Sequence, residues 1–344
     1  MSQAYLHTLP HRKLDAHSRA ADEVNCPVCH AICMAPPLYH YTVEQAAAHF
    51  CPASRDVERN QRLQDCIGRL WGGTNCVILR CDQCGFGFGH PFVGGDEEFY
   101  RILHEQKGYP AWRWDYDVGL TEAIAKFPGG KVLDIGAGVG NFLRQLGEKW
   151  ERYAVEGSGT TRRELAASRI TVFPDLEEAA HSHAGTFQVV TLFQVLEHIA
   201  DFERVLRQCR KLLVPNGRLV ITVPDGEAMI RQTRVTGCAD MPPNHIGKWT
   251  PGSLKRVITR VGFESSEPIP EPPSLNSFRA NLHMRVTSDA ANHRSISAHA
   301  SRLRNKPMRI AALSLLAAPA VLRLLPYGRQ LFAGGAFAIV GVAR

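Results

Sequence analysis

Two cysteine pairs carry the clearest chemical signal in the first part of this 344-residue sequence. Cys26 and Cys29 form one Cys-x-x-Cys pair, and Cys81 and Cys84 form a second, with Gly85 directly after it. Each pair can place two thiolates on one turn, and four thiolates suit tetrahedral Zn(II) with bonds of about 2.3 Å. A site with four protein ligands has no open position, so we expect a structural zinc ion that stabilises the fold.

The alternative is that these cysteines are core or reactive residues and that other side chains compete as ligands. The spacer of 51 residues between the pairs is long, but an insertion inside a ribbon explains it, because the entropy of loop closure grows slowly with length. A redox pair is disfavoured, since neither pair opens a βαβ unit. The competing ligands are Cys33, Cys51, Cys66, Cys76, His30 and His49.

A glycine-rich stretch at residues 131–140 is the second candidate site. Apolar residues at 132, 133 and 135 predict a buried parallel strand, and the apolar spacing at 142, 143 and 146 predicts a helix. Gly136, Gly138 and Gly140 lie between them, where glycine tolerates positive φ and lets the backbone approach a ligand closely. The stretch therefore predicts a strand, a tight ligand-binding turn and a helix.

Two carboxylates indicate which ligand this turn binds. Glu156 lies 20 residues after Gly136, at the tip of the next predicted strand, where an acid can bind both hydroxyls of a ribose. A dinucleotide fingerprint would need its third glycine at the position of Asn141. Asp134 would repel a pyrophosphate, but it suits a ligand with an amino group and a sulfonium. These residues favour S-adenosylmethionine over NAD.

Strand and helix signals alternate through the region that follows. The predicted strands are 153–156, 170–173, 187–192, 218–223, one opened by Phe263, and 335–342; the predicted helices are 201–213 and 250–262. This alternation predicts an α/β fold with a doubly wound, mostly parallel seven-stranded sheet whose last strand is antiparallel. Ligands of such sheets bind at the carboxyl edge, where Asp175 can accept a hydrogen bond from an adenine amine.

Six segments in order carry a family resemblance: VLDIGAGVG, YAVEGS, PDLEEA, FQVVTLFQVLEHI, LLVPNGRLVITVP and PPNHIGKWTPGSLKRVITRVGFE. They resemble the class I S-adenosylmethionine-dependent methyltransferases, closest to the branch that includes ubiquinone-type O-methyltransferases. The resemblance covers about residues 115–270. The cysteine pairs also resemble the zinc-binding module that precedes such domains in some bacterial members.

The resemblance implies a pocket for S-adenosylmethionine, with the glycine loop along its methionine and ribose, Glu156 on the ribose and Asp175 beside the adenine. The implied residues are Asp134, Gly136, Ala137, Gly138, Gly140, Glu156, Gly157, Asp175, Leu176, Phe193 and Gln194. One departure is Gln188, where family members often have Asp. That position usually lies at the end of the sheet away from the cofactor, so we expect activity to survive.

Two histidines are candidates for a catalytic base. Methyl transfer from a sulfonium needs mainly alignment and exclusion of water, but a hydroxyl acceptor also needs a base, and a positioned histidine contributes about 10²–10⁴-fold. His245, on the loop after the fifth strand, is the first candidate, and His198 is the second. The alternative is that both are structural. An exocyclic amine acceptor is disfavoured, because residues 193–196 lack the tetrad of that chemistry.

The sequence divides into six expected parts. They are a flexible leader (1–24), a zinc-ribbon-like module (25–95), an aromatic helical linker or lid (96–127), a methyltransferase core (128–273), a helical insertion or cap (274–331) and the last strand (332–344). The linker aromatics can cover the site or pack the module against the core. The uncharged run at 310–322 is shorter than a membrane span, so it is either a cap or an interfacial helix that contacts a membrane through 302–325.

Composition bears on the partners and the compartment of the protein. The formal net charge is +7 without a long basic block, which disfavours a nucleic-acid partner. The polar leader and the paired cysteines favour the reducing cytoplasm, with peripheral contact to the inner face of the membrane as an extension.

These residues favour a methyltransferase that uses S-adenosylmethionine and acts on oxygen of a small molecule, sugar or lipid-linked precursor. The alternatives are an RNA methyltransferase whose zinc module grips RNA, and a non-catalytic protein that binds S-adenosylmethionine. A NAD-dependent oxidoreductase is weakened by Asn141 and Asp134. The acceptor and the oligomeric state are not indicated.

Overall fold

The computed structural model describes residues 24–105, 113–236, 240–288, 296–301, 303 and 305–344. The leader up to residue 23 and two linker aromatics, Tyr109 and Trp112, lie outside the described residues.

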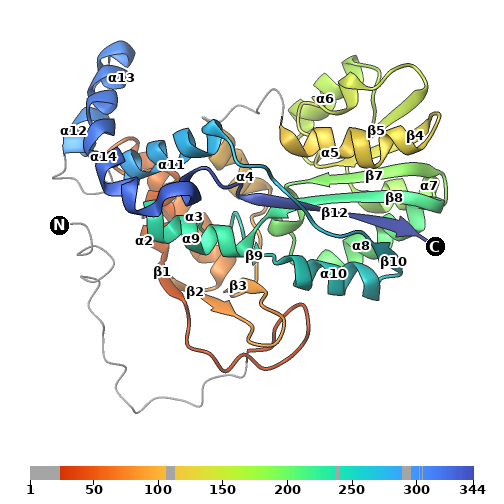
Figure 1. The fold of residues 1–344 in the computed structure, drawn as a ribbon, viewed down its shortest axis with the longest axis horizontal. Helices are drawn as coiled ribbons and strands as arrows, with labels where there is room; N and C mark the ends of the chain where they lie inside the picture. Colours follow the sequence, from red (N-terminus) through yellow and green to blue (C-terminus); the bar gives the residue numbers. More distant parts are fainter. Residues whose placement is uncertain (1–23, 106–112, 237–239, 289–295, 302, 304) are drawn as a thin grey trace.

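A mixed, mostly parallel sheet forms the largest core (Figure 1). Its strand order is β10-β12-β8-β7-β4-β5-β6, in which β8 through β6 run parallel and β12 runs antiparallel to both β8 and β10. The strands are β4 (Gly130–Ile135), β5 (Trp150–Val155), β6 (Thr171–Phe173), β7 (Phe187–Phe193), β8 (Leu213–Pro224), β10 (Phe263–Ser265) and β12 (Ala336–Ala343), with short β11 (Ile269–Pro270) also paired to β12. The predicted α/β sheet and its antiparallel last strand are confirmed.

Helices bury both faces of this sheet, which is why its parallel strands are apolar on both sides. Leu133 on β4 packs with one set of helices and Val132 with the other, because successive side chains of a strand point to opposite faces. The first face carries α7 (Leu176–Ser182), α8 (Phe202–Leu212) and α10 (Pro251–Arg260), and the second carries α5 (Trp114–Glu122), η1 (Ile124–Lys126) and α6 (Gly159–Ala167).

The helix predicted directly after the glycine loop is wrong. The chain forms only a short 3₁₀ turn, η2 (Leu143–Gln145), before β5 begins at Trp150. Phe142, Leu143 and Leu146 are buried as their spacing predicted, but too few residues separate the loop from β5 for a full helix. By contrast, α10 begins as predicted, with Thr250 in a capping box with Ser253.

The N-terminal module is a second, antiparallel sheet with helices beside it. Its elements are β1 (Tyr39–Thr42), α2 (Val43–Phe50), α3 (Val57–Trp71), β2 (Asn75–Arg80), β3 (Gly87–His90) and α4 (Glu97–His104). The sheet order is β1-β2-β3-β9, and β9 (Gly247–Lys248) comes from the loop between β8 and α10. The module therefore takes one strand from the segment that carries His245.

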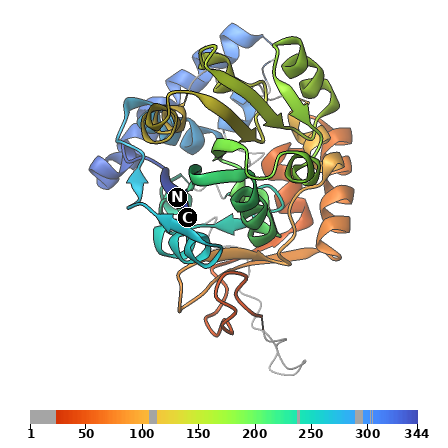
Figure 2. The same ribbon diagram turned by 90° about the vertical axis from the view of Figure 1, so that its right-hand side faces the viewer.

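The segment before β12 is helical and lies at one end of the molecule. It contains α11 (Leu275–Ser288), α12 (Ile296–Ser301), α13 (Lys306–Leu315), α14 (Ala317–Leu324) and η5 (Leu325–Leu331). Figure 1 shows α12 and α13 far from the β5 end of the sheet, and Figure 2 shows these blue helices behind it. Within the described residues, no single helix is long and apolar enough to cross a bilayer; 307–315 and 319–331, bent by 44°, pass that test only as a pair.

Candidate functional site

The four predicted zinc ligands meet in space. Cys26 Sγ lies 3.5 Å from Cys84 Sγ, and Cys29 Sγ lies 3.4 Å from Cys81 Sγ. All four sulfur atoms lie within 4.8 Å of one another. Tetrahedral zinc with bonds of about 2.3 Å needs sulfur atoms about 3.8 Å apart. The four thiols therefore fit a zinc ion with little movement.

The two cysteine pairs adopt the same backbone turn. The N–H of His30 bonds to the carbonyl of Cys26, and the N–H of Gly85 bonds to the carbonyl of Cys81, each at 2.9 Å. Both His30 and Gly85 have positive φ, 64° and 73°. In this turn the backbone amides of the second half of each pair face the first sulfur. Such amides favour a thiolate, which is the form that binds a metal.

The competing cysteines divide into two groups. Cys51, Cys66 and Cys76 are buried in a separate apolar cluster formed by α2, α3 and their neighbours, so they are core residues. Cys33 is half-buried and lies close enough to Cys81 to interact with its sulfur. The four paired cysteines remain the set with metal-ligand geometry.

The glycine loop follows β4 as a tight turn with positive φ, as the sequence predicted. Gly136, Gly138 and Gly140 have φ of 71°, 53° and 77°. A Cβ on Gly136 would lie 2.7 Å from Val195 Cγ2, and one on Gly140 would lie 2.6 Å from Leu165 Cδ2. Ala137 is buried beside them. A side chain at position 136 or 140 would therefore clash, and Gly136 is exposed at the carboxyl end of the sheet.

Acidic side chains surround this loop. Glu156 accepts hydrogen bonds from the N–H groups of Gly138 (3.0 Å) and Ser158 (2.9 Å), which ties the tip of β5 to the loop. Burial raises the pKa of Asp134 to about 7, and Thr191 donates a 2.7 Å bond to its carboxylate. A cationic ligand would stabilise the ionised form of this acid. The loop therefore fits a ligand with an amino group and a sulfonium better than one with a pyrophosphate.

Further predicted cofactor residues lie at the same edge of the sheet. Gly157 follows Glu156 directly, while Asp175 caps α7 by accepting a 2.9 Å bond from the N–H of Glu178, with Leu176 buried next to it. The adenine role of Asp175 stays a prediction, because its carboxylate has a capping role of its own. Gln188 bonds to the N–H of Lys131 at the opposite end of β4, as expected for a position away from the loop.

An ion pair that the sequence analysis missed supports the segment after β7. Arg113 binds both oxygens of buried Asp115, at 2.6 and 3.0 Å, and its guanidinium also donates to the carbonyl of Phe193 at 3.2 Å. Thr222 on β8 donates to Asp115 at 3.0 Å, and Gln194 takes positive φ beside it. Arg113 and Asp115 stand two positions apart in the predicted aromatic linker, and this spacing was the available signal.

The two candidate histidines lie side by side around a buried acid. The rings of His198 and His245 are 4.7 Å apart, and the Nε2 atom of each lies 3.9 Å from Glu197 Oε1. Glu197 is fully buried in η3 (Leu196–His198), and neither carboxylate oxygen has a hydrogen-bond partner among the described residues. Burial raises its pKa to about 7. Burying an acid without a hydrogen-bond partner costs free energy, so we expect this carboxylate to bind a ligand.

The Nδ1 atom of each histidine has a hydrogen-bond partner that fixes the orientation of the ring. His198 Nδ1 lies 2.6 Å from the carbonyl of Asn244 and 3.1 Å from the hydroxyl of Tyr100. His245 Nδ1 lies 2.6 Å from Asp240 Oδ2. Burial lowers the pKa of His198 to about 4, whereas Asp240 outweighs burial and raises the pKa of His245. Tyr100 was not predicted, because a contact across 98 residues leaves no pattern in the sequence. Asp240 lies only five residues before His245, and the sequence analysis missed this nearby carboxylate.

The loop that carries His245 is clamped between the two sheets. Ile246 donates a 2.9 Å bond to the carbonyl of Glu197, and Gly89 of the N-terminal module donates one of the same length to Ile246. Gly247 and Lys248 then pair with β3. The module thus positions the Asp240–His245 pair. The atoms of Glu197, His198 and His245 also lie within 4.8 Å of one another, so the cluster can hold a cation.

Comparisons with known proteins indicate the family of this chain. A family model described as a methyltransferase domain matches residues 114–267. A ubiquinone biosynthesis O-methyltransferase of Cronobacter sakazakii is 32% identical over 164 residues, which cover 44% of this chain and 66% of that protein. Its Pseudomonas aeruginosa counterpart is 30% identical over 171 residues, covering 42% of this chain and 73% of that protein.

The matches do not extend over whole proteins, since the chain spans between 45% and 73% of the length of the first three such relatives. A solved S-adenosylmethionine-dependent methyltransferase from Archaeoglobus fulgidus aligns with 71% of this chain and 99% of its own, at 16% identity and a TM-score of 0.45. The glycine loop and the acids around it fit S-adenosylmethionine, and the matched relatives are methyltransferases. The chain belongs to the S-adenosylmethionine-dependent methyltransferases.

Proposed function

We propose that the chain transfers a methyl group from S-adenosylmethionine to an oxygen of a small molecule, sugar or lipid-linked precursor, with His245 as the base. The observation that carries this proposal is the half-buried Asp240–His245 pair, 2.6 Å between Oδ2 and Nδ1, beside the carboxylate of Glu197, which has no hydrogen-bond partner among the described residues. The names of the matched O-methyltransferases support an oxygen acceptor. When bound, S-adenosylmethionine supplies an already activated methyl group, so the chain must align the acceptor and exclude water.

The residues at the carboxyl edge of the sheet would hold the cofactor. The glycine loop and Asp134 would hold its charged methionine end, and Glu156 keeps acceptor capacity for ribose hydroxyls beyond its two backbone bonds. Arg113 links this edge to the histidine cluster, since its charge acts on both Asp134 and Glu197. We infer that the cofactor loop and the candidate base contribute to one site.

His245 is the better base of the two histidines. When its Nδ1–H is donated to Asp240, its Nε2 carries the lone pair that takes a proton from the acceptor hydroxyl. The raised pKa of His245 makes it a stronger base than an ordinary imidazole. His198 has a pKa near 4 and is held by the carbonyl of Asn244, so it suits a positioning role. Glu197 faces both Nε2 atoms and can orient the incoming hydroxyl.

The first experiment separates cofactor binding from turnover. Calorimetric titration with S-adenosylmethionine should show binding, and titration with NAD should not. Transfer of label from methyl-labelled cofactor into an extract of the host then identifies the acceptor by mass. Binding without transfer to any component would make the chain a non-catalytic binding protein, and label in RNA would establish the RNA methyltransferase.

Replacement of the base is the decisive test of the mechanism. His245→Ala should lower turnover about 10²–10⁴-fold and leave the calorimetric affinity for S-adenosylmethionine unchanged. Exposed His40 on β1 is the matched control, and His40→Ala should keep full turnover. Equal turnover in His245→Ala would remove the base from the proposal. Loss of activity in a chelator while the four cysteines keep their zinc, with recovery on adding a divalent metal, would instead make the cluster a metal site.

A further inference from the structure

The charge of the protein is concentrated in the helical segment before the last strand. Residues 274–331 contain nine Lys or Arg and a single acid, Asp289, which gives this segment a charge of +8. The remaining residues contain 31 basic and 32 acidic side chains, so their charge is −1. The formal charge of +7 for the whole chain therefore comes from this segment alone. Such an asymmetry indicates an anionic partner for one part of the molecule.

The same segment exposes apolar side chains. Of the eleven large apolar side chains that are exposed in the described part of the chain, seven lie between residues 275 and 325. Leu315 is 79% exposed, Leu322 68% and Leu325 62%. The seven are Leu275, Ile296, Met308, Ile310, Leu315, Leu322 and Leu325. Single exposed apolar residues are ordinary, but such a concentration on consecutive helices marks an interaction surface.

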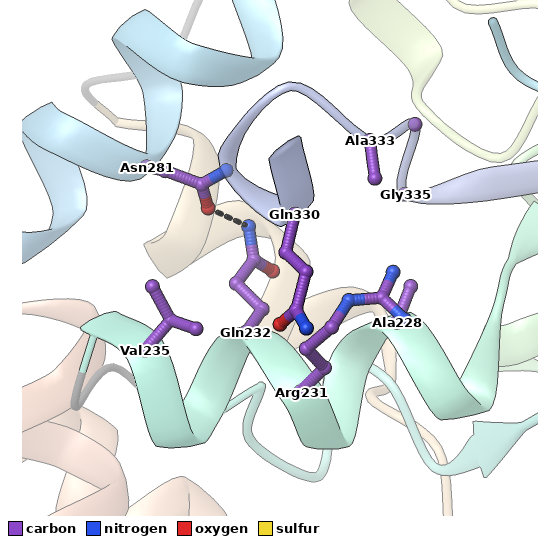
Figure 3. Close-up of a pocket in the computed structure, with 9 residues that line it drawn as sticks. Ala228, Arg231, Gln232, Val235, Asn281, Gln330, Ala333 and Gly335 are labelled. Atoms are coloured by element: carbon purple, nitrogen blue, oxygen red, sulfur yellow. Dashed lines mark hydrogen bonds between the residues drawn. The ribbon is translucent and has the colours of Figure 1, made fainter. Parts of the chain in front are cut away.

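The inner side of the segment is already occupied. Phe278 and Leu282 of α11 pack with Leu324 and Leu331 against Val235 of α9 (Gly226–Thr236). Figure 3 shows the polar part of this junction, where Gln232 points towards Asn281 with 3.3 Å between Nε2 and Oδ1. The exposed leucines therefore lie on the outer side of helices that are docked to the body.

We propose that α13, α14 and η5 bind the surface of an anionic lipid bilayer, with their exposed leucines in the interface and their arginines at the headgroups. An interfacial helix needs an apolar face and basic residues beside it. Leu322 and Leu325 share one side of the chain at helical spacing, and Arg329 follows them as an exposed cation. Each basic residue near an anionic surface adds to the attraction. This inference does not depend on the proposed methyl transfer.

An anionic lipid surface explains both the positive charge and the exposed apolar side chains of the segment. RNA or a second copy of the chain explains only one of these features. RNA would use the positive charge, but its backbone offers little to seven exposed aliphatic side chains. A second copy of the chain would bury the apolar residues, but it would bring two segments of charge +8 together. An anionic bilayer takes the leucines into its interface and the charge at its headgroups.

Vesicle binding by the full-length chain tests this proposal. The protein should sediment with vesicles of phosphatidylcholine and phosphatidylglycerol, bind weakly to pure phosphatidylcholine, and dissociate as salt is raised. The triple variant Leu315→Glu, Leu322→Glu, Leu325→Glu should bind the mixed vesicles at least about tenfold more weakly. Arg329→Gln should weaken binding about fivefold, since one charge near the surface contributes about that factor.

Controls use equally exposed apolar residues outside the segment. Val57 on α3 is 72% exposed and Met34 is 82% exposed, so Val57→Glu and Met34→Glu should bind like the natural chain. Thermal melting of all variants checks that the fold is kept. Absence of binding to the mixed vesicles, or equal binding of the triple variant, would overturn the proposal. So would an RNA complex or a dimer that depends on the same leucines while vesicles are not bound.

Discussion

Two clusters of side chains among the described residues could hold a metal ion. They differ in whether their ligand atoms already have hydrogen-bond partners. The four cysteines lie on two turns of the same design, and their sulfur atoms are already 3.4–3.5 Å apart in pairs with amides facing them. The cluster of Glu197, His198 and His245 leaves both oxygens of a fully buried carboxylate without a partner in the described part of the chain.

This difference separates a structural site from a chemical one. Four cysteine ligands fill all four positions of a tetrahedral ion, so such a site has no open position for a substrate. A buried acid and two imidazoles with nitrogens facing it remain ready to accept a hydroxyl or a cation. The two clusters are also coupled, because β9 of the module sheet continues from the loop that carries His245.

Removing the cysteine ligands should have the largest effect. Cys81→Ser combined with Cys84→Ser should abolish bound zinc and lower the free energy of unfolding by several kcal/mol, because the metal energy is folding energy. Zinc content by mass spectrometry and thermal melting measure both. Cys66→Ala is the control, since this buried cysteine lies in a different cluster and should keep the zinc. A natural chain without zinc would make the four cysteines ordinary core residues.

Replacing the carboxylate that binds His245 should have the second largest effect. Asp240→Asn removes the carboxylate that raises the pKa of His245, so turnover should fall about 100-fold and the acidic limb of its pH profile should move to lower pH. Affinity for S-adenosylmethionine should not change. A lower rate with an unshifted profile would show that Asp240 only supports the fold of the loop.

The neutral state of His198 should appear in the pH dependence of stability. Its pKa is about 4 in the folded protein against 6.5 in the unfolded chain, so the unfolded chain binds the proton first and stability falls as the pH drops through this interval. We expect a loss of about 2 kcal/mol, because partial exposure reduces the full difference. His198→Asn keeps a donor for the carbonyl of Asn244 and should flatten this slope in denaturant titrations.

The smallest effect concerns the link between the cysteine site and the large sheet. Arg260 on α10 donates to the carbonyl of Val28, in the first cysteine turn, at 2.7 Å, and it also binds Glu203. Arg260→Ala should lower the free energy of unfolding by about 1 kcal/mol without loss of zinc. Exposed Arg207 binds the same Glu203, and Arg207→Ala should change stability by less. Zinc loss in Arg260→Ala would show that the cysteine turn needs the large sheet.

Much of the fold could be predicted from local patterns. The apolar runs located the strands of the large sheet except the two-residue β11, and Thr250 marked the start of α10 through its capping box. The helix after the glycine loop failed, because spacing alone did not show how soon β5 must begin. The pairing of β9 with β3 also escaped prediction, since two residues of a loop carry no strand signal.

Groups whose chemistry depends on short spacing can be recognised in the sequence alone. Two cysteines three positions apart can share one turn, and glycines at 136, 138 and 140 can take positive φ in one loop. Both features are set by neighbouring backbone atoms, so they are visible without the fold. The conformation of the glycine loop and the clustering of the four cysteines could therefore be predicted, while their roles in binding the cofactor and zinc stay predictions.

Only the tertiary structure decided the environment of the histidines. Glu197, His245 and Tyr100 come from three distant segments, and burial among them sets which group is charged. A free His198 or Glu197 would titrate near its ordinary pKa, whereas desolvation moves the pKa of the first to about 4 and that of the second to about 7. Burial and long-range contacts are properties of the packed chain, which is why no spacing in the sequence encodes them.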